Sequence, residues 1–121
     1  MMKSANDIPY SYLLDLFRKG EPMIDETTFY FMEESPGDSH IIGYLGYGSQ
    51  PVADKPYWAG YCDHENGFTA NTADELFEAP IYGGKSLKDR WKDVYIWTIG
   101  PMEPKEFIQM FREKYPIEPF S

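Results

Sequence analysis

The chain has 121 residues and a formal net charge of −9, with 42% hydrophobic and 17% aromatic residues. This size and composition are typical of a single globular domain, residues 1–121, that buries about two thirds of the surface its unfolded chain exposes. No apolar run approaches the roughly 20 residues that span a bilayer, and the first residues lack the apolar segment of a signal peptide. Cys62 is the single cysteine, which excludes an internal disulfide and agrees with a reducing compartment, so we expect a cytoplasmic protein.

The negative charge is concentrated in the middle of the chain. Between residues 20 and 84, twelve acidic residues stand against one basic residue, Lys55, whereas the two flanking segments are nearly balanced. An acidic field of this kind opposes binding to nucleic acid or to an anionic membrane, and it speeds encounter with a basic protein. We therefore expect a basic protein partner and no binding to nucleic acid or membrane, although acidic surfaces also serve to keep proteins in solution.

The first half of the chain predicts a helix followed by a strand meander. Apolar residues at helical spacing predict an amphipathic helix over residues 7–19, with Gly20 as its C-cap. Three antiparallel strands are predicted to follow it, over residues 27–32, 40–47 and 57–62. Phe68-Thr69 is a possible return strand. Three glycines lie inside the predicted strands: Gly43, Gly46 and Gly60. A glycine in a strand indicates a bulge, a bend or the close approach of another group.

Two short helices are predicted after the strands. Thr72 is a favourable N-cap for the first of them, and Glu75 can complete a capping box. Ser86 begins a second short helix, and the glycines before it give the backbone freedom to turn. The run Gly83-Gly84-Lys85-Ser86 also has features of a phosphate-binding loop. Ala79 stands where that motif requires its first glycine, so a capped turn is favoured.

A strand and a helix complete the pattern. Residues 94–99 have high strand propensity and no charge, which predicts a central strand covered on both faces. A helix over 103–115 follows, with Pro104 tolerated in its first turn. The expected fold class is α+β. An antiparallel sheet of about four strands, the three-strand meander plus this later strand, is packed by the N-terminal and C-terminal helices and the two short helices.

Few residues point to catalysis or metal binding. Cys62, Asp63 and His64 are the only cluster of the relevant residue types, and neighbouring residues along a strand point to opposite faces. A nucleophilic cysteine needs a base and a group that orients the base, and the spacing identifies no such group. We expect no enzyme activity, no cofactor and no metal site, and we rank a catalytic role for Cys62 or His64 last.

The strands hold more aromatic residues than one face of a small sheet needs, so some are expected at the surface. Tyrosine and tryptophan beside carboxylates form a favourable protein-binding surface. The expected partner-binding residues are Glu33, Glu34, Asp38, Tyr61, Asp63, Glu65, Asp74, Glu75, Glu78 and Tyr82. The alternative is a small-ligand or carbohydrate-binding domain that uses Trp58, Tyr61 and Trp97 around a concave sheet.

The segment 71–91, NTADELFEAPIYGGKSLKDRW, resembles a signature of small, single-domain bacterial proteins of unassigned function. In size, acidity and single-domain design the chain also resembles the immunity proteins that neutralise toxins of contact-dependent and other polymorphic toxin systems. These proteins share no common fold or site, so the resemblance identifies no functional residue. It implies a non-enzymatic inhibitor that covers the basic active site of a toxin such as a nuclease.

Overall fold

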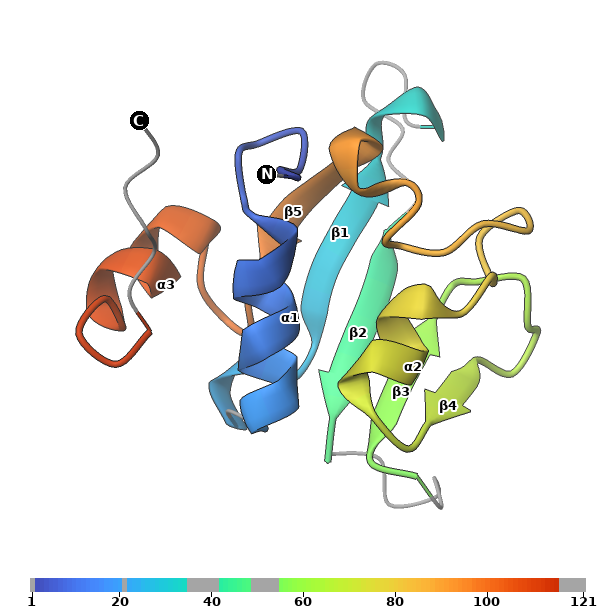
Figure 1. Ribbon diagram of the computed structural model, residues 1–121, viewed down its shortest axis with the longest axis horizontal. Coiled ribbons are helices and arrows are strands. Elements are labelled where there is room, and N and C mark those ends of the chain that lie inside the picture. The colour runs from blue at the N-terminus through green and yellow to red at the C-terminus, as the bar shows by residue number, and fades with distance from the viewer. Residues whose placement is uncertain (1, 21, 35–41, 49–54, 116–121) are drawn as a thin grey trace.

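The computed structural model describes residues 2–20, 22–34, 42–48 and 55–115. Within these residues the fold is a five-stranded antiparallel sheet with three helices (Figure 1), which confirms the α+β class. The strands are β1 Thr27–Phe31, β2 Gly43–Tyr47, β3 Tyr57–Gly60, β4 Phe68–Ala70 and β5 Val94–Thr98. The helices are α1 Tyr10–Lys19, α2 Ala73–Glu78 and α3 Pro104–Met110. In the sheet the strands lie in the order β4-β3-β2-β1-β5.

The sheet has one strand more than expected, because the possible return at Phe68 is a real strand. In β4 Thr69 lies opposite Trp58 of β3, and the two strands are antiparallel. The first four strands therefore form a continuous meander in which each pairs with the next. A segment of three residues is too short to show a period in the sequence, and its hydrogen bonding to β3 is what makes it a strand.

The strand β5 lies at an edge of the sheet, whereas we expected it at the centre. It pairs with β1 on one side, and on the other side the N-terminal segment takes the place of a strand. The amide of Ala5 donates to the carbonyl of Val94 at 2.7 Å. The Asn6 side chain donates to the carbonyl of Ile96 at 2.8 Å and accepts from its amide at 3.1 Å. Because these contacts cover backbone groups of β5, the apolar strand can stand at an edge.

The ends of α1 and α2 follow local rules. The helix α1 begins after Pro9, three residues later than expected, and it ends at Gly20, whose left-handed φ of 66° confirms the predicted C-cap. The hydroxyl of Thr72 caps α2 by accepting from the amide of Glu75 at 3.1 Å. The carboxylate of Glu75 in turn accepts from the amide of Asn71 at 3.1 Å. These caps satisfy amides that the helix itself leaves without partners.

Two of the expected helices are shorter than the sequence indicated. The second short helix is a capped turn in which Ser86 and Asp89 exchange two hydrogen bonds, followed by a 3-10 turn over Trp91–Asp93. The terminal helix α3 ends at Met110, and the turns that follow it bring Tyr115 into the core. Three or four helical residues after a cap are too few for a stable α-helix unless packing extends them.

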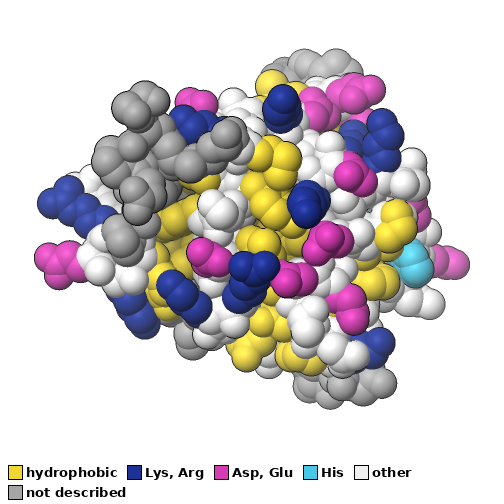
Figure 2. Space-filling view, in the orientation of Figure 1, with side chains coloured by type: hydrophobic (Ala, Val, Ile, Leu, Met, Phe, Trp, Pro, Cys, Tyr) yellow, Lys and Arg dark blue, Asp and Glu magenta, His cyan; other side chains and the backbone are white. Residues whose placement is uncertain are grey.

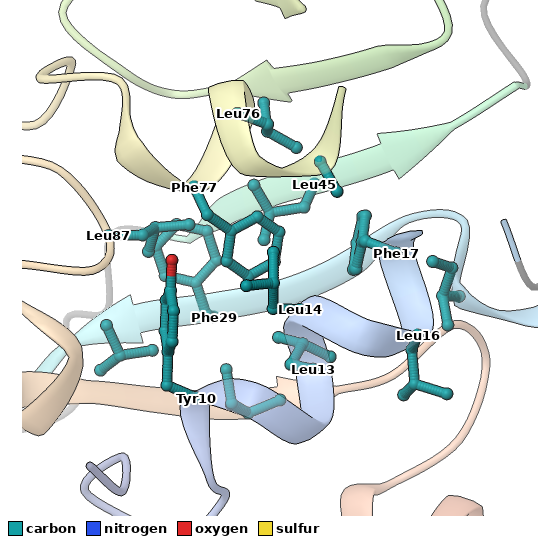
Figure 3. Close-up of a cluster of buried hydrophobic side chains, with 14 of the residues drawn as sticks. Tyr10, Leu13, Leu14, Leu16, Phe17, Phe29, Leu45, Leu76, Phe77 and Leu87 are labelled. Atoms are coloured by element: carbon teal, nitrogen blue, oxygen red, sulfur yellow. The ribbon is translucent and has the colours of Figure 1, made fainter. Parts of the chain in front are cut away.

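The core lies between the sheet and the helices α1 and α2 (Figure 3). Phe29 and Leu45 point from the sheet toward Leu13 and Phe17 of α1 and toward Phe77 of α2. All five side chains are at most 1% exposed. Because strand side chains alternate between faces, the residues next to Phe29 and Leu45 point the opposite way, to the face turned away from α1 and α2.

Candidate functional site

The face of the sheet turned away from α1 and α2 carries half-exposed aromatic side chains. Tyr30, Tyr44, Trp58 and Tyr95 alternate with buried residues along β1, β2, β3 and β5. Tyr30 and Tyr95 are cross-strand partners whose rings stack with centroids 5.0 Å apart. Both α1 and α2 pack on the other face, and α3 lies beside β5 (Figure 1). The open face therefore presents flat aromatic surfaces to solvent.

At two of the strand glycines an aromatic ring lies so close to the backbone that any larger residue would clash with it. A Cβ atom on Gly46 would stand 2.0 Å from the indole of Trp58, and one on Gly43 would stand 2.5 Å from the ring of Phe29. Gly60 is different, because its nearest neighbours would be 3.8 Å away. The expected close approach is therefore confirmed at Gly43 and Gly46, and Gly46 lets Trp58 lie flat against β2 on the open face.

Two hollows on this face flank Tyr44, and we call them together the outer groove. The larger has a volume of about 640 Å³ and is lined by Tyr44, Trp58, Tyr61, His64, Glu65 and Phe68, among others. The smaller has a volume of about 360 Å³ and is lined by Asp25, Glu26, Thr28, Tyr44, Thr98, Gly100 and Pro101. Every lysine and arginine of the chain lies among the described residues, and none of them lines either hollow.

Tyr61 projects from the end of β3 at the border of the larger hollow. It is 70% exposed, and its ring lies against Tyr44 with the centroids 5.5 Å apart. Its backbone has a φ of 55°, in the left-handed region that favours glycine. A tyrosine in this conformation costs free energy that the surrounding structure must offset, and Glu26 of the smaller hollow has a similar φ of 61°. Strain of this kind often occurs at binding sites.

The face that carries the helices is electrostatically different from the outer groove. Several of its carboxylates are in ion pairs, and Figure 2 shows acidic and basic side chains interspersed there. Arg18 holds Asp74 through two hydrogen bonds of 2.8 and 3.1 Å, which keep the pKa of Asp74 below its usual value. Further pairs join Arg18 to Asp15, Lys88 to Glu78, and Arg90 to Glu34 and Asp93. The uncompensated charge of the groove therefore comes from carboxylates such as Glu26 and Glu65.

The structure separates the expected partner-binding residues rather than gathering them. Tyr61 and Glu65 belong to the outer groove, and Asp38 lies outside the described residues. Asp74, Glu75 and Glu78 belong to α2 on the helix-bearing face, where the first and last are paired and Glu75 serves the cap. Glu33 and Glu34 are exposed in the short 3-10 turn that follows β1.

The remaining two expected residues, Asp63 and Tyr82, have structural surroundings that sequence reasoning missed. Tyr82 is only 5% exposed, so it is not the surface anchor we expected. The carboxylate of Asp63 accepts hydrogen bonds from the amides of Gly83 and Gly84, at 2.7 and 3.2 Å. The glycine-rich turn thus binds an anion, but this anion is the protein's own side chain.

Cys62 and His64 do not form a nucleophile and base pair. The Cys62 thiol contacts the carbonyls of Ala59 and His64, at 4.0 and 3.8 Å, and the His64 ring packs edge-on against Phe68. Among residues 2–20, 22–34, 42–48 and 55–115 no group of His, Cys, Asp and Glu could hold a metal ion. None of the helices in that part of the chain is both long and apolar enough to cross a membrane.

The groove contains residues that the sequence did not single out as partner-binding. The alternation of side chains along a strand could have identified Tyr44 and Trp58 as outward-facing, because each lies next to residues that face the core. Asp25 and Glu26 precede β1, and only the structure shows that this turn lies beside Tyr44. Trp97 is 50% exposed and lines neither hollow, so of the three aromatic residues expected around a ligand only Trp58 and Tyr61 belong to the outer groove.

Comparisons with protein-family models, with curated proteins and with solved structures found no match to this chain. The outer groove is therefore assigned as the candidate site on three observations: its aromatic floor, its acidic border and the strained, exposed Tyr61.

Proposed function

We propose that the chain is a non-enzymatic protein-binding protein of the immunity type, which inhibits a basic toxin such as a nuclease by occluding its active site. One observation carries the proposal: the outer groove joins an aromatic floor to an acidic border and is lined by no lysine or arginine. The cationic active site of an enzyme that acts on nucleic acid is complementary to such a surface.

The two kinds of residue have different roles in this interaction. Trp58 and Tyr61 are rigid, amphipathic anchors of the kind that contribute most of the energy in protein interfaces. Glu26 and Glu65 supply the local negative potential that accelerates encounter with a basic surface. The overall charge of −9 acts in the same direction at longer range. Occlusion needs no reacting group, which fits the ordinary contacts of Cys62.

A pair of charge-matched variants separates the groove from the overall charge. The groove variant combines Glu26→Gln with Glu65→Gln. The control variant combines Glu103→Gln, at the N-cap of α3, with Glu106→Gln, in its first turn, and both residues are exposed. The two variants have the same net charge. The partner is first recovered from the source cell at low and raised salt, and association with the purified partner is then measured over a range of ionic strength.

The groove variant is expected to associate severalfold more slowly than the control and to show a weaker dependence on salt. Tyr61→Ala is expected to accelerate dissociation by about tenfold or more, as loss of an interface anchor does. Equal effects of the groove and control variants would show that only the total charge matters, and this result would overturn the placement of the interface.

A small-ligand or carbohydrate-binding function is the second candidate, because Trp58 and Tyr61 both line the larger hollow. Aromatic stacking on a sugar depends little on ionic strength, unlike association with a basic protein. Saturable binding of a sugar that Trp58→Ala abolishes, together with no partner at either salt, would favour this candidate.

A further inference from the structure

The larger hollow of the outer groove has a glycine between two aromatic side chains. Gly60 lies opposite Tyr44 across β2 and β3, and Trp58 is two positions before it on the same face of the sheet. A Cβ atom on Gly60 would stand 3.8 Å from the Trp58 indole and 3.8 Å from Tyr44. Because Gly60 has no side chain, the space between the two aromatic residues is left open.

The aromatic rings around this glycine are accessible from solvent. Tyr61 is 70% exposed and lies against Tyr44, with the ring centroids 5.5 Å apart. Tyr44 and Trp58 are only partly buried, and both line the hollow. Its volume of about 640 Å³ is within the range of small-molecule sites. A flat group that enters the hollow therefore meets three aromatic side chains.

The carboxylate of Glu65 borders the same hollow and is not neutralised by the protein. The side chain is exposed, and it forms no ion pair or hydrogen bond with any of the described residues. None of the lysines and arginines, all of which the structure describes, lines the hollow. The protein thus brings a negative charge and aromatic rings together without a cation of its own.

A guanidinium group matches these features better than an ammonium group does. A guanidinium is planar and weakly hydrated, it stacks on aromatic rings, and it donates paired hydrogen bonds to a carboxylate. An ammonium is compact and strongly hydrated, so it loses more on leaving water and has no flat face to stack. A neutral flat group gains the stacking but not the attraction of the carboxylate.

We propose that the larger hollow binds an arginine side chain of the protein partner. The guanidinium stacks on the rings of Trp58 and Tyr61 and donates hydrogen bonds to the Glu65 carboxylate. The open space at Gly60 accommodates it between the aromatic side chains. The inference rests on the proposed function for the identity of the partner, a basic protein, and it names the side chain that the groove recognises.

The test uses three capped tripeptides that carry arginine, citrulline or lysine between two glycines. Citrulline has the planar shape of arginine without the charge, and lysine has the charge without the planar group. Each peptide is titrated into the millimolar range while the indole N–H of Trp58 and the amides of Gly60 and Gly67 are followed by nuclear magnetic resonance. Glu65→Gln removes the carboxylate, and Glu106→Gln, at an exposed position of α3, is the control with the same net charge.

The arginine peptide is expected to shift these resonances saturably and to bind about threefold to tenfold more tightly than the citrulline and lysine peptides. Glu65→Gln and Tyr61→Ala should each weaken its binding severalfold, whereas Glu106→Gln should leave it unchanged. The proposal is overturned if the arginine peptide causes no saturable shift, if citrulline or lysine binds as tightly, or if Glu65→Gln and Glu106→Gln have equal effects.

The peptides are not the partner, so this proposal and the inhibitor function fail separately. If the arginine peptide does not bind but the groove variant still slows association with the partner, the inhibitor function stands without this contact. If the arginine peptide binds in the hollow but the groove and control variants associate with the partner equally, the arginine site stands and the proposed interface falls.

Discussion

The indole of Trp58 lies so close to Gly46 that a single added carbon on the glycine would stand 2.0 Å from the ring. The two residues are cross-strand partners in β2 and β3, so the glycine and the ring share one face of the sheet. The largest aromatic side chain of the outer groove therefore depends on the absence of a side chain on the neighbouring strand.

Gly46→Ala is predicted to destabilise the protein by about 1–3 kcal/mol, because overpacking forces the indole away from β2. The displaced indole should also change the tryptophan fluorescence of the folded state. Gly60→Ala is the matched control on the same face, since its Cβ would meet no atom closer than 3.8 Å. Denaturant unfolding of both variants checks this prediction, and equal stability of the two would contradict it.

Asp63→Asn is predicted to loosen the turn at Gly83 and Gly84 and to lower stability by about 1 kcal/mol. The substitution removes the charge from the two hydrogen bonds that the carboxylate accepts, which weakens them. Hydrogen exchange at the two glycine amides should accelerate. Glu65→Gln removes the same charge from the neighbouring exposed turn and should leave that exchange unaltered. If both variants accelerate exchange equally, the carboxylate does not hold the turn.

Asn6→Ala is predicted to destabilise the protein by about 1–2 kcal/mol. The variant leaves the amide and the carbonyl of Ile96 without the partners that the Asn6 side chain supplies at the edge of β5. Thermal unfolding gives the loss of stability. Gln109→Ala, at an exposed position of α3, is the control and should have little effect. An equal and small effect of both variants would show that water replaces Asn6 without cost.

Alkaline pH is predicted to unfold the protein through buried tyrosines whose pKa values burial raises, among them Tyr10, Tyr12 and Tyr82. Burial raises the pKa of Tyr10 and of Tyr12 to about 12, from 10.0. Because the folded state holds the neutral form, their contribution to stability is complete below pH 10 and is lost progressively as the pH rises from about 10 toward 12. Tyr12→Phe removes one of these groups and should move the unfolding midpoint to higher pH.

The ultraviolet absorbance of tyrosinate and the far-ultraviolet circular dichroism follow this transition together. Ionisation of the buried tyrosines should coincide with loss of secondary structure. Full tyrosinate absorbance in a protein that keeps its circular dichroism would mean that Tyr10 and Tyr12 ionise without unfolding, contrary to the prediction.

The features that were predictable from the sequence are those set by neighbouring residues. Gly20 ends α1 because a left-handed backbone is accessible to glycine, and Thr72 caps α2 because its hydroxyl reaches an amide three residues on. The β-prone runs over residues 27–32, 40–47 and 57–62 likewise predicted β1, β2 and β3. These interactions span at most a few residues, so no knowledge of the fold is needed to recognise them.

Other features were decided only by the tertiary structure, because they join residues that are distant along the chain. Asn6 and Ile96 are 90 positions apart, and their contact determines that β5 can be an edge strand. Asp63 and Gly83 are 20 positions apart, and the Asp63 carboxylate accepts a hydrogen bond from the Gly83 amide. A carboxylate that we expected to contact a partner therefore holds a turn of the protein itself. The outer groove similarly combines the turn before β1 with the ends of β3 and β5. A local sequence pattern does not indicate which turn lies beside which strand.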